Sequence, residues 1–296
     1  MRRGGKAWVG VSGWSYASWK GPFYPAHLPA RRRLEYAAGR FNSIEINGSF
    51  YSLQRPGSYR AWHDATPRDF RFAVKGSRFI THNKKLGSVR TALANFLASG
   101  VLRLGTKLGP ILWQLPRTVT FRPERVEAFF DLLPRDTEAA AELAREHDHR
   151  VDGRGWTEAR GRHRIRHAIE PRHESFFSPA FAALARRYGI AIAFADSGDW
   201  PYTEELTAGF VYLRLHGSPA TYASRYSAAD IDRWAQRVRA WRSGDEPPDA
   251  RRLSDRNPPR RSSRDVYVYF DNDHRAHAPL NALELANALG LTQRLR

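Results

Sequence analysis

The sequence has no cysteine and a single methionine among its 296 residues. The missing thiols exclude disulfide bonds, thiolate catalysis and cysteine-ligated zinc or iron–sulfur centres within this chain. No apolar run approaches the roughly 18–20 residues that a membrane helix needs. The basic N-terminus leads into a strand pattern without the apolar stretch of a signal peptide. We therefore expect a cytoplasmic protein that has no membrane partner.

Lysine is also scarce, since six lysines stand against 42 arginines in a total of 48 basic residues. The formal net charge of +18 favours an anionic partner, such as a nucleic-acid fragment or a phosphorylated compound. The same excess arises from compositional bias, and we interpret most surface arginines in that way. Charge alone is not a nucleic-acid-binding motif.

Short β-rich runs recur along the chain, and most are followed by a segment with helical spacing of apolar residues. The eight runs are Trp8–Gly13, Ser43–Phe50, Phe70–Lys75, Pro110–Leu115, Ile165–Pro171, Ile190–Asp196, Phe210–His216 and Val266–Asn272. The segment after Asp196 has the weakest helical pattern. Eight strands alternating with helices predict an α/β fold, a parallel eight-stranded (β/α)8 TIM barrel.

The pattern predicts one domain over residues 1–296, with insertions near 135–163 and 243–264. The first insertion carries a helical pattern at Thr137–Glu146, and the second reads as a mobile loop rich in arginine and proline. A doubly wound open sheet is the alternative. Neither a Gly-x-Gly-x-x-Gly turn after the first strand nor a Gly-Lys-Ser/Thr loop is present, so both nucleotide-binding fingerprints are missing.

Charged or amide side chains end seven of these runs, in phase with the apolar residues that precede them. Barrel enzymes build their sites at this end of the strands. A paired ion network would explain the same residues. We favour a polar, cation-rich ligand pocket there. Its candidate residues are Glu45, Asn47, Lys75, Gln114, Glu170, Arg172, His173, Asp196, Arg214, His216, Asp271 and Asn272.

The sequence resembles the DUF72 (YecE-like) family in motifs spread along nearly the whole chain. The matching stretches are Gly10–Tyr16, Trp19–Tyr24, Glu45–Tyr51, Phe72–Arg78 with Thr81 and His82, Leu108–Pro116, Glu170–His173, Tyr212–Gly217, Tyr222 with Arg225–Ser227, and Val268–Asp273. The resemblance implies a (β/α)8 barrel and no established reaction. Gly48, Pro171 and a long Arg135–His163 spacer depart from the family pattern, and Pro171 leaves the pose of Glu170 and Arg172 open.

The first functional hypothesis is a protein that binds or transforms an anionic ligand bearing phosphate or carboxylate, with nucleic-acid fragments among the candidate ligands. Three cations, Lys75, Arg172 and Arg214, would hold the anion. Glu45 and Glu170 would act as acid or base, and His173 and His216 as catalytic proton shuttles. The remaining ligand-binding candidates are Asn47, Tyr51, Gln114, Asp196, Asp271 and Asn272. If the protein is an enzyme, this chemistry fits an acid/base hydrolase, lyase or isomerase.

Two alternatives come from other classes of protein. A divalent-metal-dependent barrel, similar to an isomerase or phosphodiesterase, would use Glu45, Glu170, His173, Asp196, His216 and Asp271 as ligands. The cations on the same rim oppose it, so we expect neither a metal nor a cofactor. A non-enzymatic nucleic-acid-associated protein would instead stack bases on aromatic residues such as Tyr16 and Tyr51. Oligomeric state is left open.

Overall fold

The computed structural model describes residues 4–291 of the chain. It divides into two compact units, one formed by residues 4–45 and 177–291 and the other by residues 46–176. Each strand pair recorded within a unit is parallel. No helix of residues 4–291 is both long and apolar enough to cross a membrane.

The first unit contains a run of hydrogen-bonded parallel strands in the order β2-β1-β9-β8-β7. Its strands are β1 (Ala7–Ser12), β2 (Ser43–Ile46, whose last residue falls in the second unit), β6 (Ala191–Ile192), β7 (Phe194–Asp196), β8 (Phe210–Leu215) and β9 (Asp265–Phe270). The register of β1 on β2 sets Ser12 opposite Glu45, and the register of β8 on β9 sets Leu215 opposite Phe270. The C-terminal ends of these strands therefore lie at one edge.

The second unit contains the order β5-β4-β3. These strands are β3 (Arg71–Lys75), β4 (Leu108–Gln114) and β5 (His167–Glu170). Their registers set Lys75 opposite Leu112 and Gln114 opposite Glu170. All residues of β5 are buried, as are the last four of β3 and the last six of β4. Strands buried on both faces read as nearly continuous apolar runs, which is what the sequence displays.

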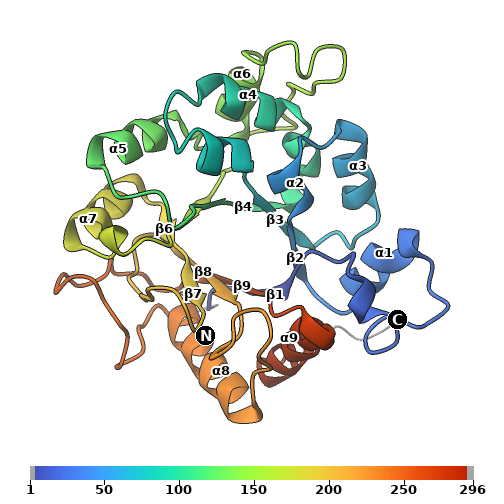
Figure 1. Ribbon diagram of the computed structural model, residues 1–296, viewed down its shortest axis with the longest axis vertical. Coiled ribbons are helices and arrows are strands. Elements are labelled where there is room, and N and C mark those ends of the chain that lie inside the picture. Colours follow the sequence, from blue (N-terminus) through green and yellow to red (C-terminus); the bar gives the residue numbers. More distant parts are fainter. Residues whose placement is uncertain (1–3, 292–296) are drawn as a thin grey trace. The chain divides into compact units, whose positions relative to one another are not determined.

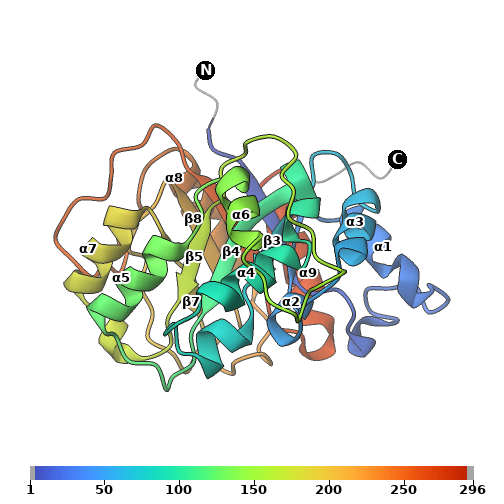
Figure 2. The same cartoon turned by 90° about the horizontal axis from the view of Figure 1, so that it is seen from above.

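Helices follow most of the strands, as the sequence predicts. They are α1 (Arg33–Ala38), α2 (Gly48–Tyr51), α3 (Pro56–Asp64), α4 (Arg90–Ala98), α5 (Pro123–Leu132), α6 (Thr137–Ala144), α7 (Pro179–Tyr188), α8 (Ala228–Arg242) and α9 (His277–Ala288). In Figure 1, α8 and α9 lie side by side in orange and red within the first unit. Figures 1 and 2 both place α4 next to α6 within the second unit.

Two predicted strands differ in detail from the structure. The second run ends at Ile46 instead of Phe50, because Asn47 adopts a helical backbone and the chain turns into α2. The Ser49 hydroxyl stabilises that turn by donating to the carbonyl oxygens of Ile46 and Lys75. The sixth run is divided at Ala193 into β6 and β7, so nine strands replace the expected eight within residues 4–291. No helix lies between Asp196 and β8, in agreement with the weak pattern there.

Two buried charged side chains hold the arginine-rich segment 243–264, Arg264 from within the segment and Glu205 from outside it. The guanidinium of Arg264 donates to the carbonyl oxygens of Gly244, Asp245 and Pro259. The carboxylate of Glu205, which is also buried, accepts from the backbone N–H groups of Leu253 and Ser254. These bonds explain how a segment with few apolar residues takes a defined path, while the predicted mobility of this segment stays a prediction.

Candidate functional site

A network of charged side chains in the first unit surrounds Arg214, near the end of β8. Arg214 has no solvent-exposed surface. Its Nη2 lies 2.9 Å from Glu45 Oε1 and 2.9 Å from Asp271 Oδ2. The same atom donates to the Ser12 hydroxyl at 3.0 Å. Two carboxylates from β2 and the end of β9 thus neutralise one buried guanidinium, which is the condition for burying a charge.

Glu45 is held as a carboxylate by three donors. Besides Arg214, the hydroxyl of Tyr212 donates to Oε2 at 2.5 Å, and the hydroxyl of Ser12 donates to Oε1. Burial, followed by the charge of Glu45, raises the pKa of Tyr212, so its hydroxyl keeps its proton. A side chain that only accepts hydrogen bonds from fixed donors is an anchor of this network. The predicted role of Glu45 as an acid or base stays a prediction.

His216 also lies within the network and has no exposed surface. Its Nε2 lies 3.3 Å from Arg214 Nη1, and a guanidinium can only donate. The imidazole proton therefore sits on Nδ1, which lies 3.1 Å from Asp271 Oδ2. The rings of Trp200 and Tyr222 contact the imidazole edge to face, at centroid distances of 4.7 and 5.5 Å. His216 is thus buried between Arg214, Asp271 and two aromatic rings, and its predicted role as a proton shuttle stays a prediction.

Asp273 and Tyr16 form the outer, partly exposed layer of this network, and neither is among the catalytic candidates from the sequence. Burial, followed by the charge of Asp271, raises the pKa of Asp273 from the usual 3.8 to about 8. The sequence signal was the repetition of aspartate two residues after Asp271. Spacing alone does not reveal that Asp271 pairs with Arg214 while Asp273 lies beside the negative charge of Asp271.

Two predicted ligand-binding residues of the first unit support the backbone. Asp196 accepts a hydrogen bond from the Tyr226 hydroxyl at 2.6 Å, and burial raises its pKa. Asn272 is fully buried and donates to the Ser224 carbonyl and to Asn281 of α9. Both contacts fix the segment that precedes α8. Asp196 and Asn272 thus lie close to the strand ends, and their hydrogen bonds in the structure go to other residues of the protein.

A cluster of positive charge occupies the second unit. Lys75, at the end of β3, is 8% exposed, and its ammonium lies 4.4 Å from the ring centroid of Phe50. Phe50 contacts His82 edge to face at 5.1 Å. Burial and then the charges of Lys75, Arg78 and Arg172 lower the pKa of His82 from 6.5 to about 4. Lys75, Arg78 and Arg172 therefore all lie near enough to His82 for their positive charges to act on it.

Arg172 has a fixed orientation in this cluster. Its Nε and Nη2 lie 3.0 and 2.9 Å from Oε1 of Glu170, which is fully buried at the end of β5. Pro171 lies between the two residues in the sequence. The ion pair forms across it, so the proline does not turn the two side chains away from each other. Pairing to a buried carboxylate restrains the guanidinium in one plane, as the binding of an anion requires.

The other predicted residues of the second unit have individual environments. The amide of Gln114 donates to the Leu115 carbonyl at 3.1 Å, and Nδ1 of His173 contacts the Ser175 hydroxyl at 2.9 Å. Asn47 starts α2. Tyr51 is 70% exposed and therefore available to a ligand. The structure groups Lys75 and Arg172 around His82 and places Tyr51 next to Phe50, at a ring distance of 5.0 Å.

Within residues 4–291, no group of three or more histidine, aspartate or glutamate side chains is arranged so that it could hold a metal ion.

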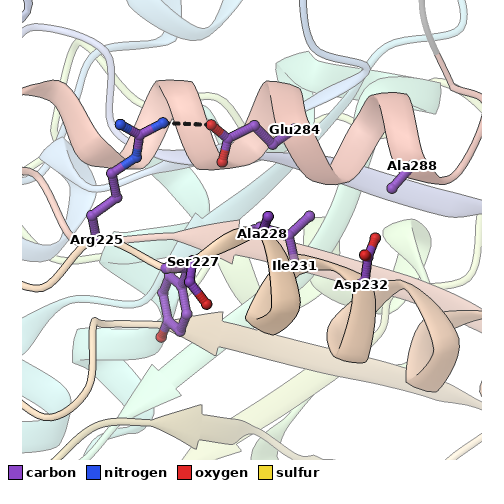
Figure 3. Close-up of a pocket in the computed structure, with 8 residues that line it drawn as sticks. Arg225, Ser227, Ala228, Ile231, Asp232, Glu284 and Ala288 are labelled. Carbon is purple, nitrogen blue, oxygen red and sulfur yellow. Dashed lines mark hydrogen bonds and ion pairs between the residues drawn. The ribbon is translucent and has the colours of Figure 1, made fainter.

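Figure 3 shows a different feature of the first unit, a cavity of about 430 Å³ between α8 and α9. An ion pair at 2.6 Å joins Arg225, in the segment before α8, to Glu284 of α9. That cavity contains none of the predicted site residues.

The strand arrangement and the charged strand ends define a parallel α/β barrel protein, the predicted fold class. The model of the family described as "Protein of unknown function DUF72" matches residues 8–296. The chain belongs to this family, and the resemblance seen in the sequence motifs is confirmed.

Solved structures support the fold over almost the whole chain. A DUF72 family protein from Thermotoga maritima is 24% identical, with a TM-score of 0.70 over 96% of this chain and 99% of that one. One from Enterococcus faecalis is 17% identical, with a TM-score of 0.65 over 98% and 100%. These likenesses concern the fold alone.

Curated relatives match a shorter region. The UPF0759 protein YecE of Escherichia coli K12 is 31% identical over 130 residues, which cover 43% of this chain and 44% of that protein. The UPF0759 protein YunF of Bacillus subtilis is 23% identical over 130 residues, covering 40% and 43%. The matches thus span less than half the length of these relatives.

Proposed function

We propose that the protein binds an anionic ligand carrying phosphate or carboxylate, and that Lys75 and Arg172 hold the anion. The observation that carries this proposal is the convergence of positive charge on His82. A site of low exposure strengthens charged contacts relative to water. The Arg172 guanidinium offers a planar donor set, and the Lys75 ammonium adds a point charge.

The second cluster supports this proposal better than the first. Arg214 already contacts two carboxylates and a hydroxyl, and it has no exposed surface for a ligand. Lys75 and Arg172 retain some exposure, since Lys75 is 8% exposed and the Arg172 side chain 15%. Asn47, Tyr51, Gln114 and His173 stay candidates for orienting the ligand, and Glu170 for positioning Arg172.

Calorimetric titration with inorganic phosphate, pyrophosphate and citrate tests this function at low and physiological salt. Lys75→Met removes the ammonium, and we expect binding to weaken at least tenfold, because a hydrogen bond to a charged group contributes about 1.5–3 kcal/mol. Arg172→Lys keeps the charge but loses the planar fork, so the loss should be similar for phosphate. Arg172→Ala is unsuitable because it leaves Glu170 buried without this partner.

Arg145→Ala is the matched control, since Arg145 is an exposed cation at the end of α6. It should bind all three anions like the wild type. The proposal fails if none of the anions binds, or if Lys75→Met binds as the wild type does while melting at the same temperature.

A further inference from the structure

Helix α7 and the arginine-rich segment 243–264 form a cavity of about 540 Å³ in the first unit. Figures 1 and 2 both show this segment, in dark orange, beside α7, in yellow. The volume lies within the range of about 300–1,000 Å³ that small-molecule sites occupy. We call it the α7 cavity. Its walls combine apolar and cationic side chains, which include Pro179, Ala183, Leu253, Arg186, Arg252 and Arg256.

One wall of the α7 cavity is a single face of the helix. Residues three and four positions apart lie on the same face of an α-helix, so Pro179, Ala183 and Arg186 all line the cavity. Pro179 and Ala183 make the start of this wall apolar, and Leu253 of the segment adds a third apolar side chain. Arg186 places a cation at the other end of the same face.

Arg186 also joins α7 to the segment and gives the cavity a defined shape. Its Nη2 donates to the Glu205 carboxylate, and its Nη1 lies 3.1 Å from the Ser254 hydroxyl. The Arg186 side chain is 12% exposed, and the Glu205 side chain has no exposed surface. Glu205 also accepts from the backbone N–H groups of Leu253 and Ser254, at 2.6 and 3.2 Å. The part of the segment that lines the cavity is therefore held in place by the protein itself.

Two further guanidinium groups lie close to Arg186 and have donors available. Burial, followed by the charge of Arg256, lowers the pKa of Arg186, and the charge of Arg252 acts in the same direction while that of Glu246 opposes it. Nη1 of Arg252 lies 3.8 Å from Glu246 Oε2, which is beyond hydrogen-bond distance. The Arg256 side chain is exposed and forms no hydrogen bond or ion pair with any of residues 4–291. Both groups therefore have N–H donors that a ligand can use.

The carboxylates nearest the cavity are mostly paired. Glu205 is buried against Arg186, and the charges of three arginines act on Glu246. Asp255 is exposed, lines the cavity and opposes the binding of an anion. Among the lining residues three arginines stand against this one aspartate, so the lining as a whole favours an anion.

We propose that the α7 cavity binds a phosphate monoester of about the size of a mononucleotide. Arg252 and Arg256 hold the phosphate, since a guanidinium can donate two parallel N–H bonds to phosphate oxygens. The apolar wall contacts the organic part of the ester, which a nucleoside or a sugar supplies. Inorganic phosphate would leave that wall and most of the volume unused. None of the lining residues belongs to the Lys75 and Arg172 cluster of the second unit.

Calorimetric titration with AMP, glucose 6-phosphate, adenosine and inorganic phosphate at physiological salt tests the class of ligand. We expect one of the two esters to bind about tenfold more tightly than adenosine or inorganic phosphate, because only the esters use both the cations and the apolar wall. The tighter ester identifies the organic part as a planar base or a sugar. The inference is overturned if neither ester binds more tightly than inorganic phosphate.

Arg252→Gln and Arg256→Gln test the role of the two cations. Each should weaken binding of the tighter ester about tenfold, since hydrogen bonds to charged groups are the strong ones. Arg260→Gln is the matched control, because Arg260 is an exposed arginine of the same segment outside the lining, and it should bind as the wild type does. Asp255→Asn should tighten binding about two- to fivefold, the usual effect of one exposed charge.

The Lys75→Met variant separates this inference from the proposed function. Ester binding that survives in Lys75→Met and weakens in Arg252→Gln and Arg256→Gln supports the α7 cavity, whatever the Lys75 site binds. Binding that is lost in Lys75→Met and unchanged in both arginine variants overturns this inference and leaves the proposed function standing. Both arginine side chains are exposed, so these variants should melt at the wild-type temperature, which differential scanning calorimetry checks.

Discussion

At the scale of single residues, hydrogen-bond partners distinguish side chains that have similar chemistry. Glu45, Asp271 and Asp273 are all carboxyls near one arginine. Glu45 accepts from three fixed donors, Asp271 faces Arg214 and His216, and burial together with the charge of Asp271 raises the pKa of Asp273. Carboxyl groups near one arginine therefore differ in environment according to their partners.

Removal of the central guanidinium should destabilise the protein strongly. Arg214→Met leaves Glu45 and Asp271 without the cation between them, and breaking a buried ion pair in this way costs about 3–5 kcal/mol. Urea unfolding of the wild type and variant measures this loss. Adding Glu45→Gln to Arg214→Met should recover part of it, because one buried charge is then gone. A loss below about 1 kcal/mol in Arg214→Met would contradict the assigned network.

The sequence identified Glu45, Arg214, His216 and Asp271 as strand-end residues, and the structure brings all four together. It also identified Lys75 and Arg172, which both act on His82. It did not single out His82 or Asp273, because their behaviour depends on neighbours distant in sequence. Asp196 and Asn272 were predicted to bind a ligand, but in the structure they bind Tyr226 and Asn281. The sequence could not reveal these contacts, because both partners lie in later segments of the chain.

At the scale of elements, local contacts decide where strands end. The alternation of apolar and polar residues predicts a strand through Phe50, but the Ser49 hydroxyl binds the Lys75 carbonyl at 2.6 Å and supports the α2 turn. That contact joins segments 26 residues apart, so periodicity within one segment does not reveal it. The helices α5 and α7 were more predictable, because each has a proline in its first turn, where the missing N–H is tolerated.

The passage out of β3 depends on Gly76. A Cβ on this residue would lie 2.3 Å from the ring of Trp113, whose indole is buried against Phe96 and Phe129. Gly76→Ala should therefore destabilise the protein by about 1–3 kcal/mol in a urea titration, the usual cost of overpacking. Gly57→Ala in α3 is the matched control, since its Cβ meets nothing within 4 Å. Equal stability of the two variants would contradict the packing of Trp113 on β3.

At the scale of the whole molecule, two groups with shifted pKa values make stability depend on pH in opposite directions. His82 titrates near 4 in the folded state and near 6.5 when unfolded, so its contribution is lost as the pH falls from 6.5 to 4. Asp273 titrates near 8 when folded and near 3.8 when unfolded, so its contribution falls as the pH rises from 3.8 to 8. Only the second effect operates between pH 6.5 and 8.

Comparison of the wild type with Asp273→Asn isolates this effect from the other titrating groups. The wild type should lose stability relative to the variant as the pH rises from 6.5 to 8, by up to about 1.4 kcal/mol per pH unit. Urea unfolding at three pH values in that interval measures the difference. A constant difference across the interval would mean that Asp273 is not protonated at neutral pH.

The net charge of +18 offers many exposed arginines to any anion, so binding alone does not locate the ligand. The most direct test is an anomalous-difference map from crystals soaked in sodium tungstate, a heavy analogue of phosphate. The proposed function predicts a tungsten peak with tungstate oxygens within about 4 Å of the Lys75 ammonium and the Arg172 guanidinium, the range of an ion pair. A map with no peak there, or with peaks confined to exposed arginines, would contradict it.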